Sequence, residues 1–156
     1  MVESSYHIDA LDRELIGVLR RGGRLSNSQL ARETAMARGT VQSRLARLVD
    51  TGVITGWGPD LNPRATNHPV AAFATLSIAQ GSHPRVLASL AKLPEVMEVH
   101  VVTGKGDLLC RMAARSNDHL HELIQSIVAI DGVIRSDSQL ALQSPIQRTV
   151  ADLIGG

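Results

Sequence analysis

Aromatic side chains are nearly missing from this sequence of 156 residues, which contains only Tyr6, Trp57 and Phe73. Proteins that bind single strands or RNA loops usually stack the bases on aromatic side chains, so this scarcity argues against that class of binder. Hydrophobic residues still make up 44% of the chain and charged residues 20%, as is typical of a folded protein. We therefore expect a core built from Leu, Ile, Val and Ala.

Cysteine is equally scarce, because Cys110 is the only one. A single cysteine excludes an intramolecular disulfide and a cysteine-based zinc cluster. Its position among apolar neighbours in an expected strand predicts a small buried side chain. No apolar run is long enough to cross a bilayer, and the first ten residues, MVESSYHIDA, show no apolar signal segment. We expect a cytoplasmic protein that does not contact a membrane.

Negative charge is nearly absent from residues 20–49, where seven arginines stand against one acidic residue, Glu33. The whole chain carries a net charge of only +1, and basic and acidic residues nearly balance from residue 65 onward. Fourteen of the sixteen basic residues are arginine, whose planar guanidinium group suits phosphates and guanine edges. This asymmetry indicates a basic module joined to a nearly neutral one.

Two helices are predicted before residue 35. The apolar residues of the first recur at helical spacing: Ile8, Leu11, Leu15, Val18 and Leu19. Asp9 is placed to cap the start of this helix. The stretch LSNSQL then predicts a second helix over residues 27–34, because Ser26 and Gln29 have the spacing of a capping box.

A third helix follows a short gap and contains RGTVQSRLARL, residues 38–48. Val41, Leu45 and Leu48 form its buried stripe, so the polar residues lie on the opposite face and the flanks. A polar, arginine-bearing face on the second helix of such a pair is typical of a helix-turn-helix, whose recognition helix enters the major groove of DNA. A solvated helix in a small bundle is the alternative interpretation.

The candidate DNA contacts divide into two groups. For base edges we select residues at the start, on the outer face and, for Gln42, on the flank of the third helix: Arg38, Thr40, Gln42, Ser43 and Arg47. Arg44 lies on the flank of this helix and is a further candidate. Ser26 and Asn27, at the start of the second helix, are candidates for contacts with the phosphate backbone.

After Asp50, the glycines and the short apolar run of TGVITGWGPDLNP favour a β-ribbon, a wing-like addition that would complete a DNA-binding domain over residues 1–60. The proline-containing stretch LNPRATNHP predicts a linker over residues 61–69.

Residues 70–142 contain an internal repeat. The segment from AAFATLSIA to LPEVMEVHVV is echoed by the segment from LLCRMAA to IDGVIRSDSQL, with an offset of 37 residues. Each copy contains a helix with an apolar stripe, formed by Val86, Leu90 and Leu93 in the first and by Leu120, Ile124 and Ile127 in the second. Two such units predict a ferredoxin-like βαββαβ domain over residues 70–156, and an α+β chain overall.

Apolar residues of both parities in the strands, such as Leu108 beside Leu109, leave one sheet face without a cover because both helices lie on the other. We therefore expect a homodimer, which would also present two recognition helices to two half-sites of double-stranded DNA.

Four stretches in this order resemble the Lrp/AsnC family of transcriptional regulators: IDALDRELIGVLRRGGRLSNSQLA, TVQSRLARLVDTGVITGW, the LNP linker and VHVVTGKGDLLCRM. The resemblance implies a winged helix-turn-helix domain followed by a RAM or ACT-like βαββαβ domain that senses a small molecule, often an amino acid. It also implies assembly of dimers into larger oligomers such as octamers. Ala37 stands where the family usually has a capping Ser, and Leu108 where it commonly has an aromatic residue.

The loop TGKGD, residues 103–107, joins two expected strands, and from its spacing alone a plain hairpin turn is the simpler interpretation. The family resemblance implies instead that this loop helps to hold the effector. The residues concerned are Thr103, Gly104, Lys105, Gly106 and Asp107. Backbone amides would bind a carboxylate group, and Asp107 would suit an ammonium group.

Two other functions stay open. Some tetrapyrrole-processing decarboxylases resemble the same two-domain family, and His100 and Arg111 keep such an enzyme possible. A protein-interaction module without DNA binding is the third alternative. No catalytic pattern of Ser, His and Asp stands out, and His119 and His121 diverge around a helix. Glu98 and His100 alone do not complete a metal site, so we expect neither a metal nor a cofactor.

Overall fold

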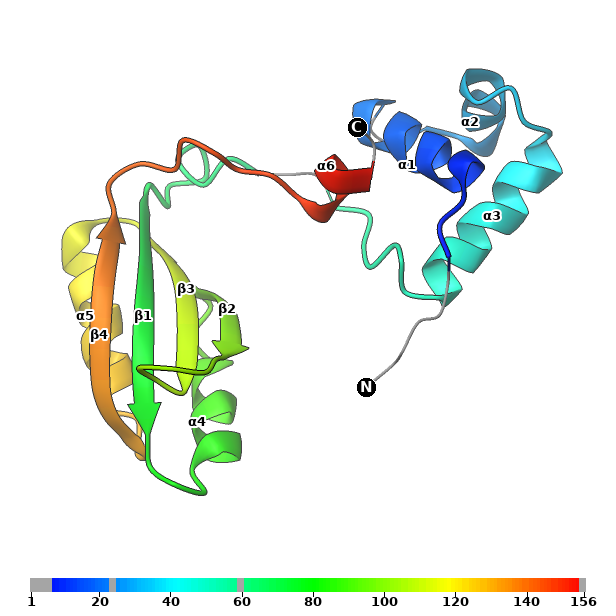
Figure 1. Ribbon diagram of the computed structural model, residues 1–156. Helices are drawn as coiled ribbons and strands as arrows, with labels where there is room; N and C mark the ends of the chain where they lie inside the picture. The colour runs from blue at the N-terminus through cyan, green and yellow to red at the C-terminus, as the bar shows by residue number, and fades with distance from the viewer. Residues whose placement is uncertain (1–6, 23–24, 59–60, 155–156) are drawn as a thin grey trace. The chain divides into compact units, whose positions relative to one another are not determined.

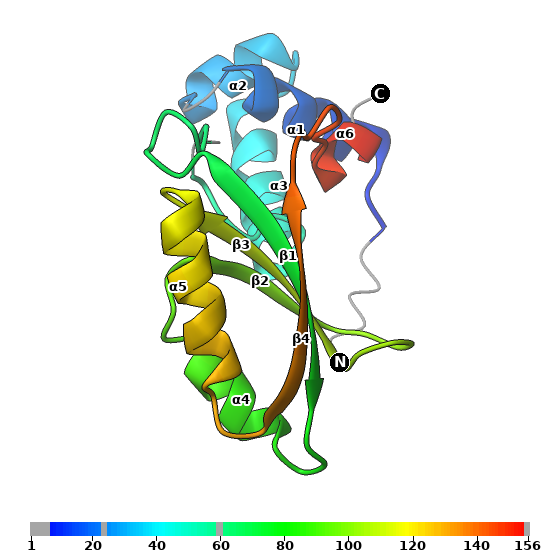
Figure 2. The same cartoon turned by 90° about the vertical axis from the view of Figure 1, so that its left-hand side faces the viewer.

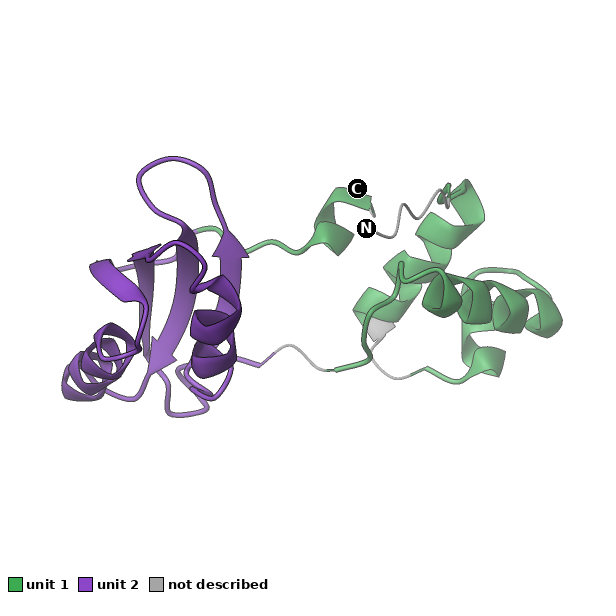
Figure 3. Cartoon of the chain, turned by 90° about the horizontal axis from the view of Figure 1, so that it is seen from below, with its two compact units in different colours: residues 1–60, 146–156 green, residues 61–145 purple. Residues whose placement is uncertain are grey.

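The computed structural model describes residues 7–22, 25–58 and 61–154. Its contacts divide the chain into two units, residues 1–60 with 146–156 and residues 61–145 (Figure 3). The first unit contains the helices α1 (Ala10–Gly22), α2 (Asn27–Glu33), α3 (Arg38–Asp50) and α6 (Val150–Ile154) (Figure 1).

The first three helices pack around a small aliphatic core formed by Leu15, Val18, Leu30, Val41 and Leu48. The stripe expected on α1 is wrong at one position. Leu11 is 41% exposed, whereas Asp12 is fully buried beside the apolar core. Asp9 caps the start of α1 as predicted, because its Oδ1 accepts a hydrogen bond from the Asp12 amide over 2.9 Å.

The capping box of α2 is confirmed. Ser26 Oγ accepts a hydrogen bond from the Gln29 amide over 3.3 Å, and Gln29 Oε1 accepts one from the Ser26 amide over 2.9 Å. These two bonds satisfy N–H groups that a helix start otherwise leaves unpaired. α2 therefore begins where the sequence predicts.

The wing-like strand expected after Asp50 is absent from residues 51–58, which contain turns and bends. The Ile54 amide instead donates to the carbonyl of Leu48 over 2.9 Å, and Val53 and Ile54 pack on the core of the first unit. The apolar run is partly buried where it folds back on the core, and the Ile54 amide has its acceptor on α3 without a neighbouring strand. Residues 59–60 of the expected ribbon lie outside the described residues.

The second unit is a four-stranded antiparallel sheet with two helices. In chain order its elements are β1 (Val70–Ile78), α4 (His83–Leu90), β2 (Val96–Val101), β3 (Leu108–Ala114), α5 (Asn117–Val128) and β4 (Val133–Ala141). The strands lie in the order β2-β3-β1-β4, with Phe73 of β1 opposite Arg111 of β3 and Gln139 of β4. This is the predicted ferredoxin-like βαββαβ arrangement, and both helices cover the same face of the sheet (Figure 2).

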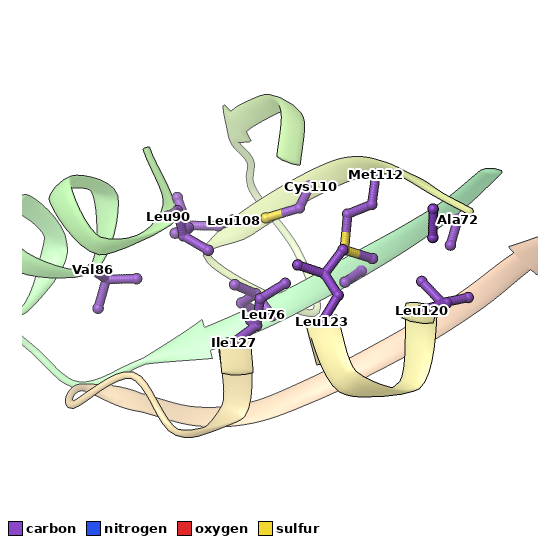
Figure 4. Packing of buried hydrophobic residues seen from close by; sticks show 12 residues of the cluster. Ala72, Leu76, Val86, Leu90, Leu108, Cys110, Met112, Leu120, Leu123 and Ile127 are labelled. Atoms are coloured by element: carbon purple, nitrogen blue, oxygen red, sulfur yellow. The ribbon is translucent and has the colours of Figure 1, made fainter. Parts of the chain in front are cut away.

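The core of the second unit lies between that face and the helices (Figure 4). Leu76, Leu108 and Met112 from the strands contact an apolar layer that the helices contribute: Val86, Leu90, Leu120, Leu123 and Ile127. The predicted stripe of α5 is confirmed at Leu120 and Ile127, whereas Ile124 is only partly buried and Leu123 is buried beside it. Cys110 is buried as expected, and this burial raises the pKa of its thiol to about 11.

The C-terminal residues belong to a different unit from the one that the sequence predicted. The last residues of the chain, from 146 onward, group with the helical unit rather than with the ferredoxin-like unit. α6 contacts α1, and the carboxylate of Asp152 pairs with the guanidinium of Arg20. Among the described residues, no helix is long and apolar enough to span a membrane.

Candidate DNA interface and effector loop

The outer face of α3 is an exposed polar surface of the three-helix core. Thr40, Ser43 and Arg47 are exposed there, while Val41 and Leu48 on the opposite side are buried. A shallow hollow is lined by Thr40, Ser43, Arg44 and Arg47. The fold therefore brings most of the predicted base-contacting side chains onto one accessible surface.

The remaining predicted DNA contacts lie around this surface. Arg38 and Gln42 are exposed on α3, and Ala37 before it provides no side-chain cap, as its sequence indicates. Ser26 is exposed and Asn27 half-buried at the start of α2. The Ser26 hydroxyl group already accepts the Gln29 amide, so its contact with phosphate stays a prediction.

Arg44 requires a different interpretation from the one that its flank position suggested. Its side chain is only 17% exposed, and Nη1 lies 2.7 Å from Asp9 Oδ2 and 2.7 Å from Asp12 Oδ1. Two carboxylates against one guanidinium group leave the cluster without a net positive charge that would attract a phosphate. We therefore assign Arg44 to the attachment of α3 to α1 rather than to direct DNA contact.

Asp12 is the residue of this region that sequence reasoning missed. It is 0% exposed, although aspartate is rarely buried unless it is paired. Its Oδ1 binds Arg44, its Oδ2 lies 3.2 Å from the Asp9 amide, and Arg47 Nη2 lies 3.9 Å from Oδ2. The signal in the sequence was a pair of acids three residues apart beside a run of arginines with almost no other acid.

Hydrogen bonding shifts the titration of this cluster. The pKa of Asp9 is lowered, first by the Asp12 amide that donates to it and then by the Arg44 side chain. The pKa of Arg44 is raised, first by its hydrogen bond to Asp9 and then by that to Asp12. Both directions favour the charged forms, so Asp9 and Arg44 stay ionised near neutral pH.

The loop between β2 and β3 is fastened to the end of β1. The Asp107 amide donates to the carbonyl of Leu76 over 2.8 Å, and Asp107 Oδ2 accepts from the Ile78 amide over 2.8 Å. Gly106 passes so close to β1 that a Cβ atom there would overlap Cγ2 of Thr75 and lie 3.1 Å from the Leu76 oxygen. Gly106 and Asp107 thus have a structural role, whatever else they bind.

The other loop residues are more open to solvent. Thr103, Gly104 and Lys105 are exposed, and Gly104 has a φ angle of 111°, in the region that favours glycine. The loop therefore brings the five predicted effector residues together in one turn, but one carboxylate oxygen of Asp107 already accepts a backbone hydrogen bond.

The sheet face away from the helices carries a mixed surface. Phe73 is 38% exposed near its centre, with Leu109 and Ala113 half-buried on β3. Glu98 pairs with Arg111 and lies 3.3 Å from His100 Nε2, and its pKa is lowered by Arg111 first and by His100 second. Within the described residues, no group of three or more His, Cys, Asp or Glu side chains could hold a metal ion.

A helix-turn-helix with an arginine-bearing outer face and a separate ferredoxin-like unit define a ligand-responsive, DNA-binding class of protein. Comparison with known proteins makes this specific. Residues 8–55 match the family model of a winged helix-turn-helix DNA-binding domain, and residues 71–151 match that of the Lrp/AsnC ligand binding domain. The regulatory protein AsnC of Escherichia coli K12 is 32% identical over 148 residues, which cover 94% of this chain and 97% of that protein.

Solved structures of regulatory proteins resemble this chain as well. Escherichia coli AsnC superimposes with a TM-score of 0.85 at 31% identity and covers 94% of this chain and 99% of that chain. A Neisseria meningitidis transcriptional regulator solved as a complex with L-Met has a TM-score of 0.83 at 26% identity, over 93% and 96% of the two chains. A feast or famine regulatory protein of Mycobacterium tuberculosis complexed with L-methionine has a TM-score of 0.79 at 30% identity, over 90% and 96%. The chain belongs to the Lrp/AsnC family and is a DNA-binding transcriptional regulator that responds to an effector.

Proposed function

We propose that the outer face of α3 reads the operator from the major groove of double-stranded DNA. The observation that carries this proposal is the exposure of Thr40, Ser43 and Arg47 on one face, which points away from the buried Val41 and Leu48. Arg38 and Gln42 extend that face, and Ser26 and Asn27 contact the backbone. Phosphate contacts by arginine supply most of the affinity, which falls steeply with salt, while base contacts supply the specificity.

The active form is a homodimer built through the open face of the sheet. Phe73 and Leu109 offer apolar surface there that no element of the ferredoxin-like unit covers among its described residues. The pairing of two copies satisfies this face and provides two recognition helices for two half-sites. Dimers assemble further into larger oligomers, of which the octamer is one form.

The effector is an amino acid bound at the loop 103–107. Two relatives were solved with L-methionine, which supports a ligand with a carboxylate and an ammonium group. The exposed turn at Thr103, Gly104 and Lys105 presents backbone amides to the carboxylate. Asp107 would receive the ammonium group through the carboxylate oxygen that does not bind Ile78. Unequal affinity of the effector for two assemblies would then change DNA binding.

This role is regulatory and not catalytic, and the chain works beside the chromosome in the cytoplasm. No observation favours a tetrapyrrole-processing enzyme, because the side chains of His100 and Arg111 both lie against Glu98. Addition of haem should accordingly produce no Soret band above that of free haem.

The experiment is a binding titration with the duplex upstream of the chain's own gene, or with a duplex selected from a randomised library. Arg47→Ala should weaken binding by about 1–3 kcal/mol if Arg47 reads a base. Arg85→Ala is the matched control, because it removes the same charge from α4 of the other unit. Equal affinities of wild type and Arg47→Ala at moderate salt would contradict the proposed interface.

A further inference from the structure

We propose that Asp12 is a positioning residue for DNA readout: its buried carboxylate, on α1, holds the guanidinium of Arg47 at the outer face of α3. This inference rests on the proposed function, because it assigns a role to a residue that does not itself reach DNA. It explains why an acid occupies the core side of a helix in a module that is otherwise basic.

The two carboxylate oxygens of Asp12 contact different partners. Oδ1 accepts the short bond from Arg44, at 2.7 Å, which fixes α3 against α1. Oδ2 accepts the Asp9 amide over 3.2 Å and faces Arg47 Nη2 at 3.9 Å. Arg47 is itself half exposed, with 50% of its side chain accessible, and lines the hollow together with Thr40 and Ser43. One buried group therefore contacts both a structural arginine and a surface arginine.

The separation between Asp12 and Arg47 suits positioning. At 3.9 Å the contact is an ion pair rather than a hydrogen bond, so it restrains Arg47 without binding it tightly. Because Asp12 is excluded from water, its charge is screened less than that of a surface carboxylate. A long side chain that is already restrained loses less conformational freedom when it binds DNA. A guanidinium group has five N–H donors, so one ion pair is compatible with a two-bond contact to guanine.

Asp9 provides a matched comparison within the same cluster. It binds the same Nη1 atom of Arg44, also at 2.7 Å, and it exchanges backbone bonds with Asp12. Its side chain is 44% exposed, and its contacts are with Arg44 and the Asp12 amide rather than with Arg47. Asp9→Asn and Asp12→Asn thus each weaken the hold on Arg44, but only Asp12→Asn removes the ion pair with Arg47.

The test is a set of double-mutant cycles on DNA affinity, with a duplex selected from a randomised library by the wild-type chain. Arg47→Ala should weaken binding about tenfold in the wild-type background and in Asp9→Asn. In Asp12→Asn the same substitution should cost less than about twofold, because Arg47 is no longer held in place. Arg38→Ala, at the other end of α3, should cost the same factor in all three backgrounds, which a general loosening of the fold would not allow.

Two results would overturn the inference in distinguishable ways. An equal loss on Arg47→Ala with and without Asp12 refutes the positioning role and leaves the proposed DNA contact intact. No loss on Arg47→Ala in the wild-type background refutes the DNA contact of Arg47, and the inference fails with it.

If Asp12→Asn does not fold, substitutions of the exposed Arg47 and Arg38 provide the test instead. The side-chain carboxyl carbon of Asp12 is observed by NMR at neutral pH in Arg47→Ala and in Arg38→Ala. We expect its resonance to move in Arg47→Ala and to stay in place in Arg38→Ala, because Arg38 begins α3 about 13 Å from Arg47 along the helix axis. An unmoved resonance in Arg47→Ala overturns the proposal.

Discussion

Replacement of Arg44 by Met should destabilise the helical unit much more than the same replacement of an exposed arginine. Methionine keeps much of the volume of the side chain but removes the guanidinium that lies 2.7 Å from both Asp9 and Asp12. Asp12 is fully buried, so its charge cannot be compensated by water once Arg44 is gone. The structure therefore predicts a loss of stability rather than a loss of DNA contact.

The size of the effect follows from the burial of the pair. Removal of one partner of a buried ion pair typically costs about 3–5 kcal/mol. Arg47 still lies 3.9 Å from Asp12, and Arg44 is 17% exposed, so we expect the lower end, about 3 kcal/mol. Arg44→Met combined with Asp12→Asn should recover most of this loss, because no buried charge is then left uncompensated and Asp9 is 44% exposed to water.

The assay must report on the helical unit alone, because a chain with two units need not unfold in one step. Hydrogen exchange of the amides in α1 and α3 provides this, with the amides of β1 and β3 as the internal reference. Arg32→Met, at an exposed position on α2, is the matched control. A loss below about 0.5 kcal/mol in Arg44→Met, the usual range for surface substitutions, would refute the structural role of Arg44.

Three further predictions concern other parts of the chain. Gly106→Ala should destabilise the ferredoxin-like unit by about 1–3 kcal/mol, measured by denaturant unfolding, because the new methyl group overlaps Thr75; an unchanged midpoint would show that the loop yields freely. The pKa of Asp9 is lowered from its ordinary 3.8, so its paired form stabilises the fold above pH 3.8 and loses this effect as the pH falls further. Acid unfolding of the helical unit should therefore be less steep in Asp9→Asn, and identical curves would contradict this. Deletion of residues 146–156 should speed hydrogen exchange in α1, because it removes α6 and the partner of Arg20; unchanged exchange would mean that the segment does not pack there.

Local signals in the sequence predicted most of the elements. The capping box at Ser26 and Gln29 depends on residues three apart, and the structure forms it as predicted. The repeat with an offset of 37 residues likewise predicted the sheet with two helices on one face, because each βαβ copy carries its own apolar periodicity. The capping box, and the apolar periodicity within each copy of the repeat, depend on residues close together in the chain. A single sequence therefore contains enough information to predict them.

The errors arose where the outcome depended on distant residues. Leu11 and Asp12 are neighbours, and an aspartate beside a leucine normally faces water. Here Asp12 is buried because Arg44, 32 residues away, lies against it. No periodicity of α1 alone could contain that information.

The missing wing strand and the close packing of the loop 103–107 against β1 have a related cause. The apolar run at Val53 and Ile54 has the composition of a strand, but the core of the helical unit accepts it without strand pairing. The close approach of Gly106 to Thr75 follows from the register of β1 with β3, which places Leu76 opposite Leu108. A register is a property of two paired strands, so the loop sequence alone could not reveal it.

The central claim is that the outer face of α3 lies against duplex DNA, and site-directed photocrosslinking tests it most directly. Ser43→Cys, on that face, and Ser126→Cys, exposed on α5, are labelled with the same photoreactive group. The native Cys110 is buried and its thiol pKa is raised to about 11, so it stays unlabelled. We predict adducts with the selected duplex from position 43 and none from position 126, and adducts from position 126 alone, or in equal yield from both, would contradict the account.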